Sequence, residues 1–246
     1  MKPEEMNARW LRETYFFGIP MTDNYGNPIP DSVLEFYIKK AIGEIEDNLK
    51  IKVLPQIVIE RKDFRIENWK NFSTLSLNCV PVREIVKVKM KTATHEWVEI
   101  PKEWITIHNP MTGIISFIPV LGSIEGIRLQ SIVSFFVPVL TGAIWFPALW
   151  EIEYKTGFED IPEDIADAIG MIASIQLFNI FGDLVIGAGI ANISMGIDGI
   201  SLSVGTTSSA ENAAYSARIR EYERQLEKFT FPVLKQKYRK ISFSVL

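Results

Sequence analysis

The sequence IPEDIADAIGMIASIQLFNIF, residues 161–181, has the clearest helical pattern in the chain and decides the fold. Pro162 suits the first helical turn, where its missing N–H needs no partner, and Asp160 can cap that turn. Apolar residues recur at three- and four-residue steps, and after the first two turns no charge appears until Asp183. A helix that is apolar around most of its circumference must be covered on most sides. The stretch is therefore predicted to be a central helix, covered by its own fold or by another subunit.

Two further helices are expected, one on each side of the central helix in the sequence. The stretch DSVLEFYIKKAIGEIEDNL, residues 31–49, has one apolar stripe and one charged face, which is typical of an amphipathic helix. The stretch AENAAYSARIREYERQLEKF, residues 210–229, has a narrower stripe and is expected to stop before Pro232. Residues 1–30 are dense in Gly, Pro, Asn and Asp, so they are predicted to be mostly irregular, with 15–17 packed back on the body.

Between residues 52 and 155 the apolar pattern changes to a period of two, which indicates β-strands. In VREIVKVKMK, residues 82–91, lysines alternate with apolar residues, so one face of the sheet should meet water. The candidate strands are 56–60, 74–77, 82–91, 97–100, 104–108, 113–118, 127–137 and 150–154. The predicted fold class is therefore α+β. A small helical bundle, 1–51 and 158–246, would carry an antiparallel β-rich insert, 52–157, between its first and central helices.

One uncharged run, LQSIVSFFVPVLTGAIWFPALW at 129–150, is long enough to cross a bilayer. It contains Pro138, Gly142 and Pro147, and Val, Ile and Phe dominate its first half. This composition favours a buried strand, a turn and a second strand entered through Pro147 over a transmembrane helix. An apolar loop exposed at an oligomer interface is also compatible with the run.

Composition excludes several classes of function. The chain has 246 residues, 47% of them hydrophobic and 23% charged, and its net charge of −4 argues against a dominant nucleic-acid or anionic-membrane surface. The single Cys79 allows no internal disulfide, and two histidines, His95 and His108, make a zinc cluster improbable. The N-terminal sequence MKPEEMNARW lacks the apolar core of a signal peptide, so an intracellular protein is the default expectation.

No pattern in the chain predicts catalysis or a cofactor. There is no G-x-S-x-G, no H-E-x-x-H and no Cys with a plausible His partner. The phrase GAGIAN has Asn192 where a dinucleotide fingerprint needs its third glycine, and it follows a helix. The acids near residue 163 are better explained as helix N-terminal charges than as metal ligands. Four tryptophans sit among Ile, Val and Pro and are expected in the core: Trp97, Trp104, Trp145 and Trp150.

Two segments after the central helix leave alternatives open. The stretch 182–212 alternates apolar residues with Gly, Ser and Asn, so it is either an extended segment or a hairpin turning at Asp198-Gly199. Residues 218–240 carry eight basic side chains and three acidic ones. These cations either complement the helix C-terminal dipole beside an exposed tail, or form a docking segment for an acidic partner or for nucleic acid.

Four phrases taken together resemble the head–tail connector, or adaptor, proteins of tailed bacteriophages, and they cover most of the chain in order. They are FGIPMTDNYGNPIPDSVLEFYIKKAIGEIEDNLKI (17–51), FSTLSLNCVPVREIVKV (72–88), WFPALWEIEYKTGFEDIPEDIADAIG (145–170) and ISMGIDGISLSVGTTSSAENAAYSARIREYERQLEKFTFPVLKQKYRKI (193–241). None of these is a catalytic motif, so their joint occurrence carries the resemblance. The β-rich insert departs from the shortest members of the family.

The resemblance implies a non-enzymatic structural protein of the virion, located in the neck at the portal vertex and assembled in the host cytoplasm. Such proteins form a homo-oligomeric ring, typically a dodecamer, that binds the portal protein and tail or neck proteins and extends the channel for packaged DNA. No cofactor, no metal and no membrane are expected. An alternative class is a cellular scaffold or membrane-associated interaction module that uses the apolar segment 129–150.

The resemblance also suggests two sets of site residues. A C-terminal segment of these proteins commonly docks on the portal, and here it would use Lys235, Lys237, Tyr238, Arg239, Lys240, Phe243 and Leu246. An extended arm of small residues can lie along a neighbouring subunit, and its interface residues would be Ile193, Met195, Ile197, Ile200, Leu202 and Val204. Ile165, Ile169, Ile172 and Ile175 would then be intramolecular core, with Gln176 and Asn179 toward the subunit boundary.

Overall fold

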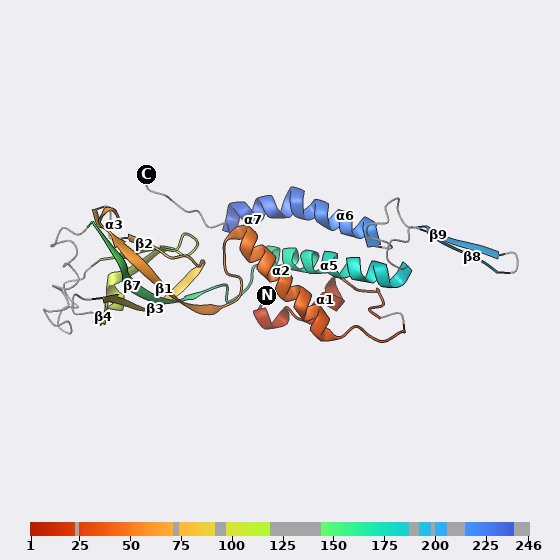
Figure 1. Ribbon diagram of the computed structural model, residues 1–246, viewed down its shortest axis with the longest axis horizontal. Coiled ribbons are helices and arrows are strands. Elements are labelled where there is room, and N and C mark those ends of the chain that lie inside the picture. The colour runs from red at the N-terminus through yellow and green to blue at the C-terminus, as the bar shows by residue number, and fades with distance from the viewer. Residues whose placement is uncertain are drawn as a thin grey trace. The chain divides into compact units, whose positions relative to one another are not determined.

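The computed structural model describes residues 1–22, 25–70, 74–91, 97–118, 144–186, 192–197, 200–205 and 215–238. The chain divides into two compact units (Figure 1). The first is formed by Met1–Leu49 and Asp160–Lys237, and the second by Lys50–Glu159 together with Tyr238. The first unit is mainly helical and the second mainly antiparallel sheet, so the predicted α+β class is confirmed.

The helical unit is built around the central helix α5, Glu163–Ile186. Helix α2, Asp31–Leu49, and helix α6, Ser216–Gln225, both pack against α5, as Figure 1 shows. The apolar stripe predicted for α2 is the face it buries, from Leu34 to Leu49. Helix α5 begins two residues later than the pattern predicted, because the Pro162 carbonyl precedes the first turn and accepts the N–H groups of Ile165 and Ala166. The helix also ends five residues later than predicted, at Ile186.

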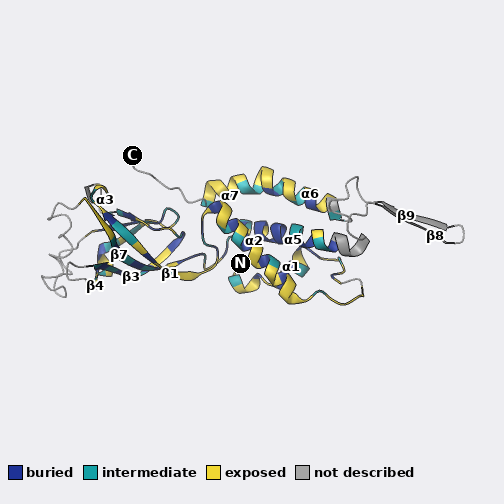
Figure 2. Ribbon diagram, viewed as in Figure 1, coloured by how far each residue is buried: buried dark blue, intermediate teal, exposed yellow. Residues whose placement is uncertain are grey.

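Burial explains the apolar character of α5, which is the most deeply buried helix of this unit in Figure 2. Ile165, Ile169 and Ile172 are buried as predicted, whereas Ile175 is only half-buried. By length and composition Glu163–Phe181 could cross a membrane, and among the described residues it is the one such helix. In this structure 67% of its apolar window is buried by the protein itself, as expected for a core helix.

The prediction that residues 1–30 are mostly irregular is wrong for their first half. A short 3₁₀ turn, Pro3–Glu5, leads into helix α1, Ala8–Thr14, whose N-cap Asn7 accepts the N–H of Trp10. The side-chain cap was the signal available in the sequence, but a helix of seven residues has too few apolar repeats to reveal itself. After α1, Tyr15 and Phe16 are buried as predicted, whereas Phe17 is exposed.

Tyr15 joins α1 to the central helix at a point where α5 has no side chain. Its hydroxyl donates to Asp167 Oδ1 at 2.6 Å and to the Asp167 carbonyl at 3.1 Å, and burial, followed by the hydrogen bond to Asp167, raises the pKa of Tyr15. A methyl group at Gly170 would lie 2.2 Å from the Tyr15 ring. The ring therefore occupies the space that any larger residue at this position would need.

A glycine-to-alanine substitution should have opposite effects on stability in α2 and in α5. Gly43→Ala in α2, where the new Cβ meets nothing within 4 Å, should raise the free energy of unfolding by roughly 0.5–1 kcal/mol. Gly170→Ala in α5 should lower it by about 2 kcal/mol, because the Tyr15 ring must move and give up its bonds to Asp167. Urea unfolding of both variants measures this, and equal stabilisation by the two would contradict the proposed packing of Tyr15.

The last helix does not stop before Pro232, which corrects the sequence prediction. Helix α6 is followed without interruption by a π-helical turn, Leu226–Thr230, and by helix α7, Phe231–Tyr238. The N–H of Phe231 bonds to the carbonyl of Leu226, five residues earlier. The wider turn places Pro232 in the first turn of α7, where a missing N–H is tolerated, so the helix can continue through it.

The second unit contains two antiparallel sheets. The four-stranded sheet has the order β1-β7-β3-β4, with β1 Gln56–Arg65, β7 Trp145–Thr156, β3 Val82–Lys91 and β4 Trp97–Glu99. The three-stranded sheet has the order β2-β6-β5, with β2 Thr74–Ser76, β6 Ile114–Phe117 and β5 Ile105–Asn109. A short helix α3, Ile66–Lys70, which the sequence pattern did not predict, follows β1.

The core of this unit lies where the two sheets share aromatic side chains. Trp150 of β7 is fully buried and stacks on Phe117 of β6, with ring centroids 4.9 Å apart. Trp104 is buried as predicted, but the core prediction is wrong for Trp97 and Trp145, which are exposed. Each finds a polar partner instead: the Arg61 guanidinium lies over Trp97, and the indole of Trp145 donates to Asp63.

The water-facing side of the four-stranded sheet carries ion pairs between strands, in agreement with the alternation seen in residues 82–91. Glu151 of β7 lies between Arg61 of β1 and Lys89 of β3, with N–O distances of 3.1 and 3.2 Å. Lys155 pairs with Glu84 at 2.7 Å. The predicted strand 127–137 lies outside the described residues. The predicted strand 150–154 is part of β7, which begins five residues earlier.

The stretch after α5 contains a β-hairpin, which decides between the two alternatives left by the sequence. Strands β8, Asn192–Ile197, and β9, Ile200–Gly205, pair antiparallel. Ile197 and Ile200 are the innermost pair, in agreement with the predicted hairpin, and Asp198 and Gly199 lie outside the described residues.

Candidate interaction surfaces

The register of the hairpin places all six predicted interface residues on one face. Three cross-strand pairs join Ile193 to Val204, Met195 to Leu202 and Ile197 to Ile200. Because successive residues of a strand alternate between faces, the opposite face holds Asn192, Ser194 and Gly196 with their partners Gly205, Ser203 and Ser201. The hairpin is thus apolar on one face and small and polar on the other. A two-stranded hairpin is at best marginally stable alone, so such a face favours a covering surface.

The predicted portal-docking residues lie on α7 and beyond it. Lys235 is exposed, with its ammonium 5.9 Å from the centroid of the Phe231 ring. Lys237 pairs with Asp164 of the first turn of α5 at 2.9 Å, and the ring of Tyr238 meets Phe158 edge-on. Arg239, Lys240, Phe243 and Leu246 lie outside the described residues. Lys237, one cation of this basic segment, therefore forms an ion pair within the helical unit.

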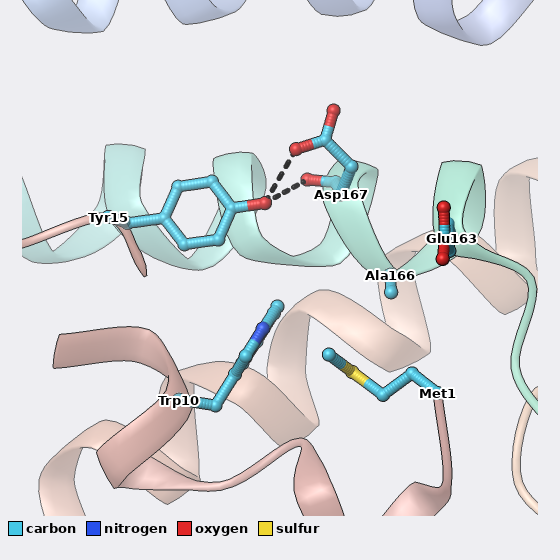
Figure 3. A pocket seen from close by; sticks show the side chains of 6 residues that line it. All are labelled: Met1, Trp10, Tyr15, Glu163, Ala166 and Asp167. Carbon is cyan, nitrogen blue, oxygen red and sulfur yellow. Dashed lines mark hydrogen bonds between the residues drawn. The ribbon is translucent and has the colours of Figure 1, made fainter. Parts of the chain in front are cut away.

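A first pocket, with a volume of about 270 Å³, lies beside the start of α5. Figure 3 shows that Trp10 and Tyr15 approach it from the N-terminal segment and that Glu163, Ala166 and Asp167 approach it from α5, with Met1 on the remaining side. The Met1 ammonium donates to the Ile161 carbonyl at 3.0 Å, and the Ile161 N–H donates back to the Met1 carbonyl at 2.7 Å. These bonds anchor the N-terminal segment at the pocket.

A second pocket, of about 210 Å³, lies between α2, α5 and the π-helical turn. Its apolar side chains are Ile172, Ile175, Leu226 and Phe231. Its polar side chains are Glu44, Gln176, Glu223 and Glu227. Gln176, which the sequence predicts near a subunit boundary, donates to Glu44 at 3.4 Å, while its own amide oxygen is buried and has no donor among the described residues.

The β-rich unit contains a buried carboxylate that sequence reasoning missed. Glu60 of β1 is 9% exposed and accepts hydrogen bonds from the Tyr154 hydroxyl and from the N–H groups of Asn78 and Cys79. It also forms an ion pair with Lys62 at 3.1 Å. Burial alone would raise the pKa of Glu60, but the bonds from Tyr154, Asn78 and Lys62 outweigh it and hold the pKa below its ordinary value. The sequence of β1 does not mark this position, because Ile57, Val58 and Ile59 are all apolar and leave the inward face of the strand undecided.

The histidines and the acids at the start of α5 form no metal cluster among the described residues. Over the described ranges, no three His, Cys, Asp or Glu side chains are grouped so as to hold a metal ion. His108 shares a hydrogen bond with Ser116, and His95 lies outside the described residues. The acids at the start of α5 have structural contacts, since Asp164 accepts the N–H of Ile165 and pairs with Lys237.

Comparison with known proteins relates the chain to phage-like particles through its fold. No protein-family model and no curated protein matches it. A chain from the virion of a native gene transfer agent (GTA) particle is similar, with 14% sequence identity and a TM-score of 0.51, covering 100% of this chain and 95% of that chain. A chain from the neck of a native GTA particle aligns with 14% identity and a TM-score of 0.47, covering 88% of this chain and 86% of that chain. A chain from the neck of an empty GTA particle aligns with 13% identity and a TM-score of 0.46, covering 89% of this chain and 83% of that chain. The protein therefore shares its fold with a GTA virion chain, which agrees with the resemblance to head–tail connectors.

Proposed function

We propose that this protein is a structural component of a phage-like particle: a head–tail adaptor that forms a homo-oligomeric ring beneath the portal. The ring extends the DNA channel from capsid to tail, and the protein has no enzymatic activity. It resides in the virion neck after assembly in the host cytoplasm. The observation that carries the proposal is the full-length likeness to a chain of a GTA virion.

The geometry of the hairpin supports the ring. A subunit of a closed ring presents two different surfaces to its two neighbours, so it needs more than one complementary face. The apolar face of β8–β9 supplies one of these surfaces. In this proposal it lies along the next copy, and its small polar face points away from that contact.

The charge of the chain supports a channel without sequence preference. The net charge is −4, and a wall that passes DNA should not hold it through many phosphate contacts. The basic residues of α7 and of the segment after it would dock on the portal protein, and other surfaces would bind tail or neck proteins. The ring is proposed to contain twelve copies, as is typical of the connectors that the chain resembles.

The experiment that tests the proposal is assembly of the purified protein, alone and with its portal protein. Sedimentation velocity and negative-stain electron microscopy should show ring-shaped particles, either for the protein alone or on the portal. A chain that stays monomeric even with the portal protein present would overturn the proposal. Flotation with liposomes would indicate the membrane-associated alternative instead.

A further inference from the structure

The pocket beside the π-helical turn has carboxylates on its rim, and no cation of the described residues pairs with them. Glu44, Glu223 and Glu227 are exposed, and none of them forms an ion pair with a described residue. Glu221, on the same helix, differs in this respect, because Arg224 holds it at 2.7 Å and lowers its pKa to about 2. Arg224 thus neutralises Glu221 of α6, whereas the three glutamates that line the pocket have no such partner among the described residues.

The buried amide of Gln176 adds an acceptor to these carboxylates. Its nitrogen donates to Glu44, so the amide is oriented by the pocket rim. Its oxygen is buried without a donor among the described residues. A buried acceptor without a hydrogen bond is costly, so a ligand that brings an N–H donor to this point would recover free energy.

The π-helical turn gives the pocket its apolar floor. In a regular α-helix, residues five apart point in clearly different directions, whereas the wider π-turn brings them nearer to the same side of the helix. Leu226 and Phe231, five residues apart and joined by the π-type hydrogen bond, both line the pocket together with Ile172 and Ile175. The floor is therefore suited to an aliphatic chain, and the rim to a charged donor.

A lysine side chain matches both the apolar and the polar parts of this pocket. The methylene stem of a lysine can cover the apolar floor while its ammonium donates to carboxylates and to the Gln176 oxygen. Helix α6 and the turn that follows it also supply such a side chain. Lys228 is exposed, has no ion pair with any described residue, and follows Glu227 directly in the π-helical turn, so the two side chains leave the helix in different directions.

We propose that Lys228 of one copy inserts into this pocket of the next copy. This contact rests on the proposed ring, in which one side of each subunit meets a different side of its neighbour. The C-terminal helix would then carry both halves of the interface, with Glu223 and Glu227 on one side and Lys228 on the other. The contact is electrostatic at its rim, so added salt should weaken it.

A charge exchange tests the contact, because every copy carries both partners. Glu223→Lys with Glu227→Lys should raise the dissociation constant of the assembled ring by about tenfold or more, and Lys228→Glu should do the same. The triple variant, which reverses both sides, should regain most of the lost affinity. The matched control is Glu35→Lys with Glu67→Lys, two exposed acids that do not line the pocket, and this variant should assemble like the unmodified protein.

A second measurement keeps the inference testable if a charge-reversed variant fails to fold. Carbodiimide coupling of rings made from mixed isotope-labelled and unlabelled copies should join Lys228 of one copy to Glu223 or Glu227 of another. The inference is overturned if unmodified rings form but the triple variant regains nothing, or if these glutamates couple to another lysine or to the portal protein. In those cases the adaptor function stands. Absence of any ring from the unmodified protein, alone or on the portal, would instead overturn the proposed function.

Discussion

Replacing Met195 and Leu202 together by threonine should abolish ring assembly while the helical and β-rich units remain folded. The two residues are cross-strand partners in the middle of the apolar face of β8–β9. Burying a side chain of this size contributes about 1.5–3 kcal/mol, so in the proposed ring the pair would contribute roughly 3–6 kcal/mol to each subunit contact. Because threonine favours strands, the hairpin itself should persist. Sedimentation velocity, alone and with the portal protein, measures the loss of assembly.

The control for this variant lies on the other face of the same hairpin. Ser194 and Ser203 are also cross-strand partners, one pair away from Met195 and Leu202. Ser194→Thr with Ser203→Thr introduces the same residue type on the polar face and should leave assembly unchanged. If both double variants lose assembly, the hairpin matters as a whole rather than through its apolar face. If the Met195 and Leu202 variant still forms rings, the proposed subunit interface is wrong.

The sequence was most informative where periodicity extends over many residues. Helices α2 and α5 and the alternation of β3 were predictable, because their buried residues recur at a regular spacing. The sequence predictions were wrong where an element is too short to show a repeat, or where a local backbone feature changes the usual effect of a residue. Helix α1 is too short to show a repeat, and Pro232 is accommodated by a π-turn that no propensity reveals.

Polar groups in the interior were the least predictable part of the candidate sites. Glu60 reads as an ordinary strand carboxylate until the fold brings Tyr154 and the N–H groups of Asn78 and Cys79 to it. The pocket beside the π-turn similarly combines residues of three helices that are far apart in the sequence. Only the expected boundary position of Gln176 hinted at the second of these places, and nothing in the sequence hinted at the first. Their partners depend on tertiary structure, which a single sequence does not specify.

Glu60→Gln should lower the free energy of unfolding of the β-rich unit by about 2–3 kcal/mol at neutral pH. The substitution keeps the size of the side chain but turns one acceptor into a donor. That donor would face the Lys62 ammonium or the N–H of Asn78, both of which now bond to the carboxylate. Urea unfolding followed by tryptophan fluorescence reports on this unit, since five of the six tryptophans belong to it. Glu84→Gln is the control: it also removes a carboxylate paired across strands, but an exposed one, and should leave the urea midpoint nearly unchanged.

Comparing the unmodified protein with the Glu60→Gln variant should also show how pH affects the stabilisation by Glu60. The pKa of Glu60 is lowered in the folded state, so its stabilising contribution is complete above the ordinary carboxyl pKa near 4.5. The contribution is lost as pH falls through the lower folded value, because the bound proton removes the charge that Lys62 and the N–H groups stabilise. The difference in unfolding free energy between the unmodified protein and Glu60→Gln should therefore be largest at pH 7 and shrink below about pH 4. A difference that stays constant over this range would show that Glu60 acts through packing alone and that its charge does not stabilise the fold.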